Sequence, residues 1–506
     1  MEAHAGCGRA DKADGRHGAR PPRASSPARD PERGHRRVTG TRYGSRMTAS
    51  PAAVVPQRTD RRALVSWALW DWGSAAFNAV VTTFVFSTYL ASRAFVDPAL
   101  VGDTSAAGKA IVERELAHNA AVVSTALTIA GIVVALVAPA MGRLADSSGH
   151  RRRSVLIATI GVALSIGGMV FVAPSQPYLL LGAALLGIGT VAYEIASVGY
   201  NAMIGQVASG ERTGRVSAIG WAAGYFGGIV LLVLLLVLCI QDFRGDGVVG
   251  GLLQLPATVA TGQWDVRVAI GIAAVWLAVS SIPLFLTVPE AVPDRTRGGG
   301  VFSAYADLGR DIARLWRERR NVLAFLLASA VFRDGVGAVF TFGGIVAAQV
   351  FGFTPSQVIL FAIAANVVAG IATFVSGRLD DRFGSRALIM VSLVGLAVCG
   401  VGVFAAGNET QWFWVLGLTL AVFVGPVQSS SRAYLARLTT PGREGELFGL
   451  YATTGRAASF LAPALFGVAV TVGGSTRFGI LGVVVVLIAG LVLMAFVKRE
   501  PQGARA

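Results

Sequence analysis

Long apolar segments alternate with short polar ones along almost the whole chain. Each apolar run has about 20 residues or more, the length that a helix needs to cross the ~30 Å hydrocarbon core of a bilayer. Backbone groups in lipid must be hydrogen-bonded within their own segment, so these continuous runs predict helices rather than barrel strands. The twelve predicted spans cover 63–91, 118–141, 154–173, 178–203, 215–241, 266–288, 321–350, 356–377, 387–406, 411–435, 447–472 and 476–497.

The composition excludes a soluble protein. Of the 506 residues, 54% are hydrophobic and 14% are charged, whereas soluble domains carry ~25% charged residues. The 3 cysteines lie far apart, and the 5 histidines show no zinc-binding spacing. No nucleotide-binding G-x-x-x-x-G-K-[ST] loop and no G-x-S-x-G nucleophile segment occurs. The sequence therefore predicts an all-α integral membrane protein that is not an enzyme and needs no metal or cofactor.

The net charge of +15 needs a closer reading before it indicates nucleic-acid binding. Residues 1–62 contain 14 Arg/Lys and 6 Asp/Glu, and they are rich in Pro, Gly and Ala. This composition predicts a disordered basic extension with no nucleic-acid partner, although such a tail can also touch nucleic acid or anionic lipid. Met47 opens a more ordinary amino terminus, so an alternative interpretation treats residues 1–46 as a start-site error.

The loops divide into an arginine-rich set and an arginine-poor set, which predicts the orientation. The rich set includes 289–320, with seven arginines, and is assigned to the cytoplasmic side of the cytoplasmic membrane together with both termini. This loop also separates two six-helix halves, 63–288 and 321–497, with residues 498–506 as a tail. Its Pro/Gly-rich start is followed by apolar residues at helical spacing from Phe302 to Trp316. That pattern predicts an amphipathic helix on the lipid surface, with a partner-binding helix as the alternative.

The two halves repeat each other. Asp-x-x-x-Ala-x-Phe begins at Asp71 in span 1 and at Asp334 in span 7. Glu194-x-x-Ser-x-x-Tyr in span 4 corresponds to Gln428-x-x-Ser-x-x-Tyr in span 10. Both halves also carry G-R-L-x-D-x-x-G after their second span. Duplicated halves with a site between them are typical of transporters.

The repeated loop suggests a conformational clasp. Its glycines allow a tight turn, and its Asp can accept from backbone N–H groups or pair with Arg in one conformation and release in another. The alternative is a positively charged loop that only fixes topology. The predicted clasp residues are Gly142, Arg143, Asp146, Gly149 and Arg151 in the first copy, and Gly377, Arg378, Asp381, Gly384 and Arg386 in the second.

The doubled loop resembles the signature of the major facilitator superfamily over roughly residues 60–500. Five further segments resemble the subfamily that includes fungal autophagy-related vacuolar effluxers and bacterial relatives: 70–77, 200–202, 333–335, 425–432 and 441–451. One departure is Ser74, where the subfamily usually has Asn. The resemblance implies alternating-access transport by two pseudo-symmetric six-helix halves, and the fungal members imply amino-acid export.

Ionisable residues inside the spans carry the functional hypothesis. A charge near the bilayer centre costs ~2.5–3.5 kcal/mol on insertion scales, so such groups usually face a cavity. In the superfamily spans 1, 4, 7 and 10 line that cavity, and both signs of charge occur on them here. The expected solute-binding residues are Asp71, Ser74, Asn78, Glu194, Asn201, Arg333, Asp334, Gln428, Arg432 and Arg456.

A mixed-sign cavity favours a small polar or zwitterionic solute, with amino acids first, moved outward. An arginine would bind a carboxylate and an acid would bind an amine. Glu194 and Asp71 are the predicted sites for a coupling proton. The alternative is that these charges only pair with one another to hold helices together. Drug or metabolite efflux by the same fold, and a non-transporting receptor or partner subunit, remain alternative functions.

Two further patterns lead to packing predictions. The glycines Gly220, Gly224, Gly227 and Gly228 of span 5 predict close helix packing. The tryptophans at the start of span 1, including Trp67 and Trp70, predict an interface belt rather than a binding box.

Overall fold

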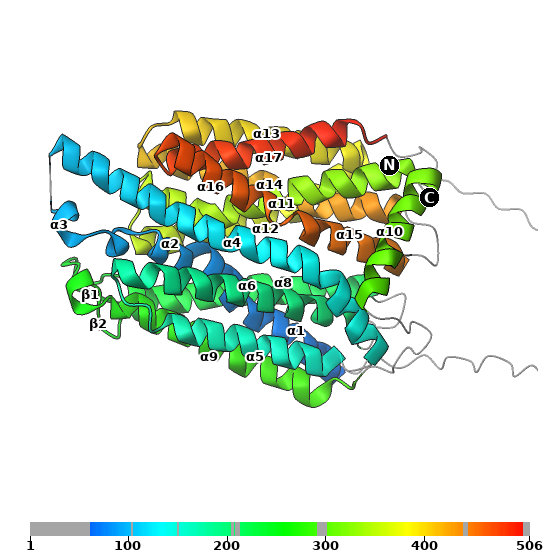
Figure 1. The fold of residues 1–506 in the computed structure, drawn as a ribbon, viewed down its shortest axis with the longest axis horizontal. Coiled ribbons are helices and arrows are strands. Elements are labelled where there is room, and N and C mark those ends of the chain that lie inside the picture. Colours follow the sequence, from blue (N-terminus) through cyan, green and yellow to red (C-terminus); the bar gives the residue numbers. More distant parts are fainter. Residues whose placement is uncertain are drawn as a thin grey trace, which may run out of the picture. The chain divides into compact units, whose positions relative to one another are not determined.

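The computed structural model describes residues 61–102, 105–148, 151–203, 207, 213–290, 301–438 and 444–498 (Figure 1). The chain divides into two units, Met1–Val55 and Pro56–Ala506, and every described helix belongs to the second. Nearly all of the predicted extension and of the C-terminal tail therefore lies outside the described residues.

In the first half a helix forms at each of the six predicted spans. Span 1 consists of α1 (Arg61–Ala75), the π-helix η1 (Ala76–Phe84) and α2 (Phe86–Leu90). Spans 2 to 6 are α4 (Ala106–Ser148), α5 (Arg151–Met169), α6 (Leu179–Ala202), α8 (Thr213–Leu235) with the π-helix η5 (Leu236–Ile240), and α9 (Trp264–Thr287). The connections contain η2 (Arg93–Phe95), α3 (Pro98–Val101), η3 (Gln176–Tyr178), η6 (Val259–Thr261) and a hairpin of β1 (Val249–Gly250) and β2 (Leu255–Pro256).

The second half has the same order of spans. It consists of α11 (Arg320–Gln349), α12 (Pro355–Phe383), α13 (Ser385–Ala405), α14 (Thr410–Leu438), α15 (Glu444–Ala458) with α16 (Leu461–Gly473), and α17 (Arg477–Ala495). Helix α10 (Val301–Glu318) occupies the stretch for which the sequence predicts an amphipathic helix, and it runs across the ends of the spanning helices (Figure 1).

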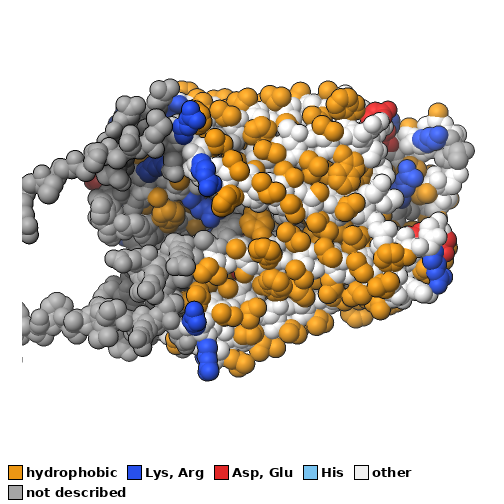
Figure 2. Space-filling model, turned by 180° about the vertical axis from the view of Figure 1, so that it is seen from behind, with side chains coloured by type: hydrophobic (Ala, Val, Ile, Leu, Met, Phe, Trp, Pro, Cys, Tyr) orange, Lys and Arg blue, Asp and Glu red, His pale blue; other side chains and the backbone are white. Residues whose placement is uncertain are grey.

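Within the described residues, eleven helices are long and apolar enough to cross a membrane. The remaining predicted span, span 1 (63–91), is helical but divided into three segments of 15, 9 and 5 residues. Hydrophobic side chains cover the middle of the face shown in Figure 2, and charged side chains lie toward its two ends. This distribution fits a molecule surrounded by lipid at its middle.

Two of the differences from the predicted spans have a clear physical reason. Helix α4 begins at Ala106 rather than at 118, because residues 106–117 are good helix formers but too polar to register as part of a span. The predicted single span 447–472 is divided between Ala458 and Leu461. Pro463 explains this break, since it lacks the N–H that would bond the carbonyl four residues earlier.

The glycines of span 5 allow a close approach to span 1. A Cβ added to Gly227 would lie 2.4 Å from the carbonyl oxygen of Trp72, and one added to Gly220 would lie 2.7 Å from the Trp67 ring. Real side chains do not tolerate such distances, so glycine is required for this approach. The predicted packing role is confirmed.

Equivalent contacts show the pseudo-symmetry of the two halves. Arg152, at the start of span 3, donates from Nη1 to the carbonyl of Val288 at 3.1 Å. Arg386, at the start of span 9, donates from Nε to the carbonyl of Val497 at 2.7 Å. In each half an arginine of the third span thus binds the carbonyl that follows the sixth span.

Candidate functional site

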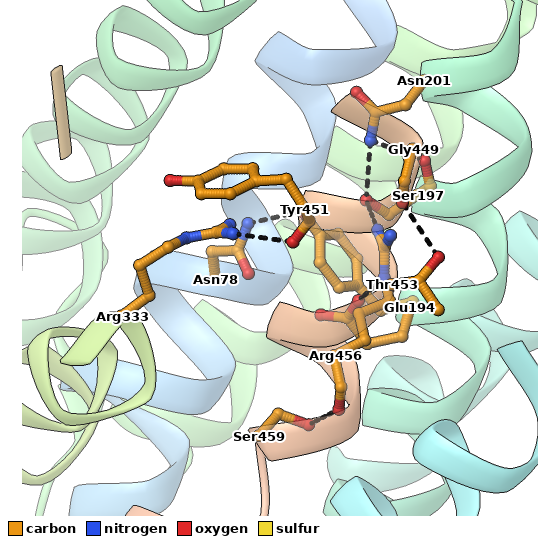
Figure 3. A network of polar contacts seen from close by, with 11 residues as sticks. Asn78, Glu194, Ser197, Asn201, Arg333, Gly449, Tyr451, Thr453, Arg456 and Ser459 are labelled. Carbon is orange, nitrogen blue, oxygen red and sulfur yellow. Dashed lines mark hydrogen bonds and ion pairs between the residues drawn. The ribbon is translucent and has the colours of Figure 1, made fainter. Parts of the chain in front are cut away.

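An ion pair connects the two halves of the molecule (Figure 3). Nε of Arg456 on α15 lies 2.8 Å from Oε2 of Glu194 on α6. Its Nη2 also donates to Ser197 Oγ at 3.1 Å, and Asn201 donates from Nδ2 to the Ser197 carbonyl at 2.7 Å. The side chains of Arg456 and Glu194 are 17% and 31% exposed, so a small solute can reach this pair.

Arg333 of α11 contacts the other side of α15 (Figure 3). Its Nη1 donates to the carbonyl of Tyr451 at 3.2 Å, and its Cζ lies 4.1 Å from the centre of the Tyr451 ring, a cation–π contact. The Tyr451 hydroxyl lies 2.6 Å from Ser431 Oγ on α14. These contacts join spans 7, 10 and 11 next to the ion pair.

Asp71 near the end of α1 has a different environment. Ser74 Oγ lies 3.4 Å from Asp71 Oδ1 and donates to the Asp71 carbonyl at 2.9 Å. A Cβ added to Gly220 would lie 3.2 Å from Asp71 Oδ2, so this glycine leaves room for the carboxylate. No ion pair of Asp71 occurs within the described part of the chain.

Asn78 and the two predicted residues of span 10 complete the set on the central helices. Asn78, in the π-helix η1, is exposed and donates from Nδ2 to the hydroxyl of Tyr193 at 2.6 Å. Arg432 donates from Nε to the carbonyl of Gln428, one turn earlier on α14, at 3.4 Å. Because π-helical segments concentrate at functional sites, the presence of η1 supports a functional role for the residues around Asn78.

Asp334 contacts a helix end. Its Oδ2 accepts the backbone N–H of Ala462, in the first turn of α16, at 2.7 Å. A carboxylate in this position caps the N-terminus of a helix. Of the ten predicted solute residues, the structure thus joins Glu194 to Arg456 directly, links Asn201 to them through Ser197, and places Ser74 against Asp71. It assigns Asp334 to a helix end.

The prediction of an interface belt at the start of span 1 is wrong for Trp67 and Trp70, which are each 2% exposed. Both rings stack on Tyr200 of α6, with centroid distances of 4.5 and 4.2 Å. Trp70 also lies 6.3 Å from Tyr193, which stacks on Phe77 at 5.2 Å. This column of aromatic rings fixes span 1 against span 4 beside Asp71.

The predicted clasp is described only in part. Four of its residues lie wholly or by their side chains outside the described part: Gly149, and the side chains of Arg143, Asp146 and Asp381. Gly142 and Gly377 lie near the C-terminal ends of α4 and α12, and Arg151 begins α5. Arg378 stacks over Phe374 with Cζ 5.3 Å from the ring centre, and Gly384 has a φ of 85° between α12 and α13.

The buried acid of the second loop is Asp380, a residue that sequence reasoning missed. It pairs with Nη2 of Arg437 at 2.8 Å and accepts from Ser385 Oγ at 2.8 Å. Arg437 ends span 10, so this pair holds the loop to a neighbouring helix. The charge of Asp380 beside Asp381 in the sequence was the available signal.

The halves also meet at the end of the bundle where α11 terminates. Gln349 donates from Nε2 to the carbonyls of Ala91 and Leu116, the latter at 3.1 Å, and contacts Thr476. Ser356 Oγ, at the start of α12, donates to the carbonyl of Ile240 at 3.4 Å. Sequence reasoning missed Gln349 because a single glutamine at a span end carries no pattern.

Comparison with known proteins identifies the chain. Residues 59–505 match the family described as "Vacuole effluxer Atg22 like". The chain belongs to this family. An uncharacterized MFS-type transporter of Bacillus subtilis (strain 168), YxiO, is 27% identical over 439 residues, which cover 86% of this chain and 94% of that protein. Autophagy-related protein 22 of Cryptococcus neoformans is 26% identical over 311 residues, which cover 57% of this chain and 51% of that protein.

Solved structures support the fold. A D-xylose–proton symporter superposes with a TM-score of 0.59 at 16% identity, covering 87% of this chain and 97% of that one. The nucleoside transporter NupG superposes with a TM-score of 0.57 at 13% identity, covering 86% of this chain and 98% of that one. This Atg22-like protein is therefore a multi-pass membrane transporter with the major facilitator fold, and it is not an enzyme.

Proposed function

We propose that this Atg22-like protein is a secondary transporter that exports a small zwitterionic solute, with amino acids first, by alternating access. The distribution of charge between the halves supports the proposal. The first half contributes the acids Asp71 and Glu194, and the second half contributes Arg333, Arg432 and Arg456. Asp334, the one acid that interrupts this separation, is engaged by a helix end.

Such a separation suits a molecule that carries both charges. A guanidinium group binds a carboxylate through two parallel hydrogen bonds, and a carboxylate binds an ammonium group. The solute would therefore lie with its carboxylate toward the second half and its amine toward Asp71. A drug-binding function is less well supported, because side chains of both charges on the central helices suit a polar solute better than an apolar one.

Proton coupling is part of the proposal. Glu194 and Asp71 are the two acids that would carry the proton, and they differ in one respect. Glu194 is held by Arg456 at 2.8 Å, whereas Asp71 has no ion pair within the described residues. We further propose that the cytoplasmic membrane holds the protein with both termini in the cytoplasm, so that Gln349 closes the outer end.

The test is counterflow of a panel of labelled amino acids into proteoliposomes at equal internal and external pH. Exchange is expected for the wild type and is expected to disappear in Arg432→Ala and Glu194→Gln. The matched controls are Arg320→Ala and Glu113→Gln, since both side chains are exposed outside the site. Exchange that survives both site variants would discard the proposed site. Absence of exchange for every amino acid, in folded wild-type protein, would contradict the proposed solute and favour drug efflux or a receptor.

A further inference from the structure

Span 11 is broken next to the residue that connects the halves. Helix α15 ends at Ala458 and α16 begins at Leu461. The ring of Pro463 removes the N–H that would bond the Ser459 carbonyl. Ser459 closes the end of α15 instead, since its Oγ and its N–H both donate to the Arg456 carbonyl, at 2.8 and 3.2 Å. Arg456 therefore sits in the last turn before the break.

Two consecutive residues of span 7 hold the two pieces of span 11 separately. Arg333 donates to the carbonyl of Tyr451 in α15 at 3.2 Å. Asp334 accepts the N–H of Ala462 in α16 at 2.7 Å. The break frees this N–H from its usual intrahelical acceptor, and the carboxylate also interacts favourably with the positive end of the helix dipole. Span 7 thus straddles the break.

The two pieces also differ in how they meet the first half. On α16, the Pro463 carbonyl accepts from Ser124 Oγ of α4 at 2.5 Å. A Cβ added to Gly467 of α16 would lie 2.4 Å from the hydroxyl oxygen of Ser124, so α16 and α4 approach each other closely. Helix α15 also packs on α4, and in addition it reaches α6 through the partly exposed side chains of Arg456 and Glu194. Both pieces therefore contact α4, and only α15 adds an ion pair with a second helix of the first half.

We propose that the break in span 11 is a hinge, about which α15 moves with Tyr451 and Arg456 while α16 stays on α4. Asp334 is then a positioning residue: it fixes the hinge by capping α16 and binds neither solute nor proton. The role of the hinge in transport rests on the proposed function. The capping of α16 by Asp334 can be tested without any solute.

The first test compares Asp334→Asn with Asp334→Ala. Asparagine keeps an acceptor oxygen for the Ala462 N–H, and alanine does not. In Asp334→Ala, hydrogen–deuterium exchange of the amides of 461–464 is expected to accelerate about tenfold, the size of a lost helix cap, and counterflow is expected to fall by a similar factor. Asp334→Asn is expected to stay within about threefold of wild type in both, with an unchanged pH profile of transport. An Asp334→Asn variant as impaired as Asp334→Ala, or one with a shifted pH profile, would overturn the cap, because the charge itself would then be used.

The second test restores the missing hydrogen bond with Pro463→Ala. This variant is expected to slow exchange of the amides of 459–464 and to lower the maximal rate of counterflow about tenfold, with little change in half-saturation, because a continuous helix no longer bends. Pro355→Ala is the matched control, since Pro355 stands at the first position of α12, where the N–H has no intrahelical partner. If Pro463→Ala fails to fold, Pro463→Gly supplies the same N–H.

A full transport rate in Pro463→Ala, together with slowed exchange, would overturn the hinge. If folded wild-type protein moves no amino acid, the proposed function fails. Hydrogen–deuterium exchange of the Asp334 variants still shows whether Asp334 caps α16. The two failures are therefore distinguishable.

Discussion

Asp71 in span 1 and Asp334 in span 7 occupy equivalent places in the two halves of the repeat. Each carboxylate faces the fifth span of its own half: Asp71 lies beside Gly220 of α8, and Asp334 beside Ala462 of α16. Helix α8 is continuous at this point, whereas span 11 is broken before Pro463. Of these two aspartates, only Asp334 therefore meets a free backbone N–H. It caps a helix, whereas Asp71 is the one that we propose for solute or proton.

Spans 4 and 10 show the same divergence. Ser197 accepts from Arg456, and its counterpart Ser431 bonds the hydroxyl of Tyr451, so both reach α15. Glu194, however, corresponds to the uncharged Gln428. Duplication therefore retained the positions of these side chains while the charges separated, with acids in the first half and arginines in the second. This asymmetry supports the proposed zwitterionic solute.

The largest difference is expected between the same substitution made in span 1 and, separately, in span 7. Asp71→Asn is expected to lower counterflow about 100-fold, because a hydrogen bond to a charged group contributes about 1.5–3 kcal/mol. Asp334→Asn is expected to remain within about threefold of wild type, since its amide oxygen still caps α16. Initial rates at equal amounts of reconstituted protein measure both. Equal losses in the two variants would remove the functional difference between spans 1 and 7.

The second prediction concerns the pair that joins the halves. Arg456→Ala is expected to lower the free energy of unfolding by about 2 kcal/mol, less than the 3–5 kcal/mol of a fully buried pair, because both side chains are partly exposed. Adding Glu194→Gln should recover most of that loss, since no unpaired carboxylate then remains. Thermal unfolding of the single and double variants in detergent gives the coupling free energy. Additive losses would show that the pair contributes nothing to the contact between halves.

The spans, the repeat and the membrane class followed from the sequence, because hydropathy and duplication leave strong one-dimensional patterns. The contact of Glu194 with Arg456 was among the pairings that the charges allowed. The cap at Asp334 was not foreseen, because it requires a broken helix 128 residues away in sequence. Pro463 in the middle of an apolar run was the available signal for that break.

Differences of one or two residues have another origin. Near the second repeated motif Asp380 is buried beside Arg437, whereas the repeat drew attention to Asp381. Arg152 makes the contact equivalent to that of Arg386, whereas the motif drew attention to Arg151. A loop motif gives the spacing of residues but not the rotational phase at which a helix presents them. Trp67 and Trp70 were misjudged for the same reason, since their position near a span end says nothing of the face on which they lie.

A smaller effect is expected where the halves meet at the end of α11. Gln349→Ala removes the donor to the carbonyls of Ala91 and Leu116, which weakens this contact by about 1 kcal/mol. The rate at which an outside thiol reagent modifies Leu116→Cys, in a background without native cysteines, is then expected to rise about fivefold. Gln357→Ala is the matched control, because Gln357 only caps its own helix α12. An unchanged rate would show that Gln349 does not hold this end closed.

The smallest effect is expected in the connections after the fifth spans, where the halves differ most in length. Residues 474–476 alone join α16 to α17, whereas the first half carries the β1–β2 hairpin. Before this hairpin, Asp242 accepts the backbone N–H groups of Arg244, Gly245 and Gly247 at 2.9, 2.7 and 2.8 Å. These hydrogen bonds hold the pKa of the exposed Asp242 carboxyl below its ordinary value of 3.8.

Because the folded pKa is depressed, the stabilisation of this loop is fully present above pH 3.8 and is lost as the pH falls through the folded pKa. Asp242→Asn is therefore expected to speed exchange of the amides of 244–247 at neutral pH, after correction for intrinsic rates, and to leave counterflow unchanged. Wild-type protein is expected to show the same acceleration only in acid. A transport defect in Asp242→Asn would mean that the longer connection of the first half takes part in the cycle, and the difference between the halves would then extend beyond the central charges.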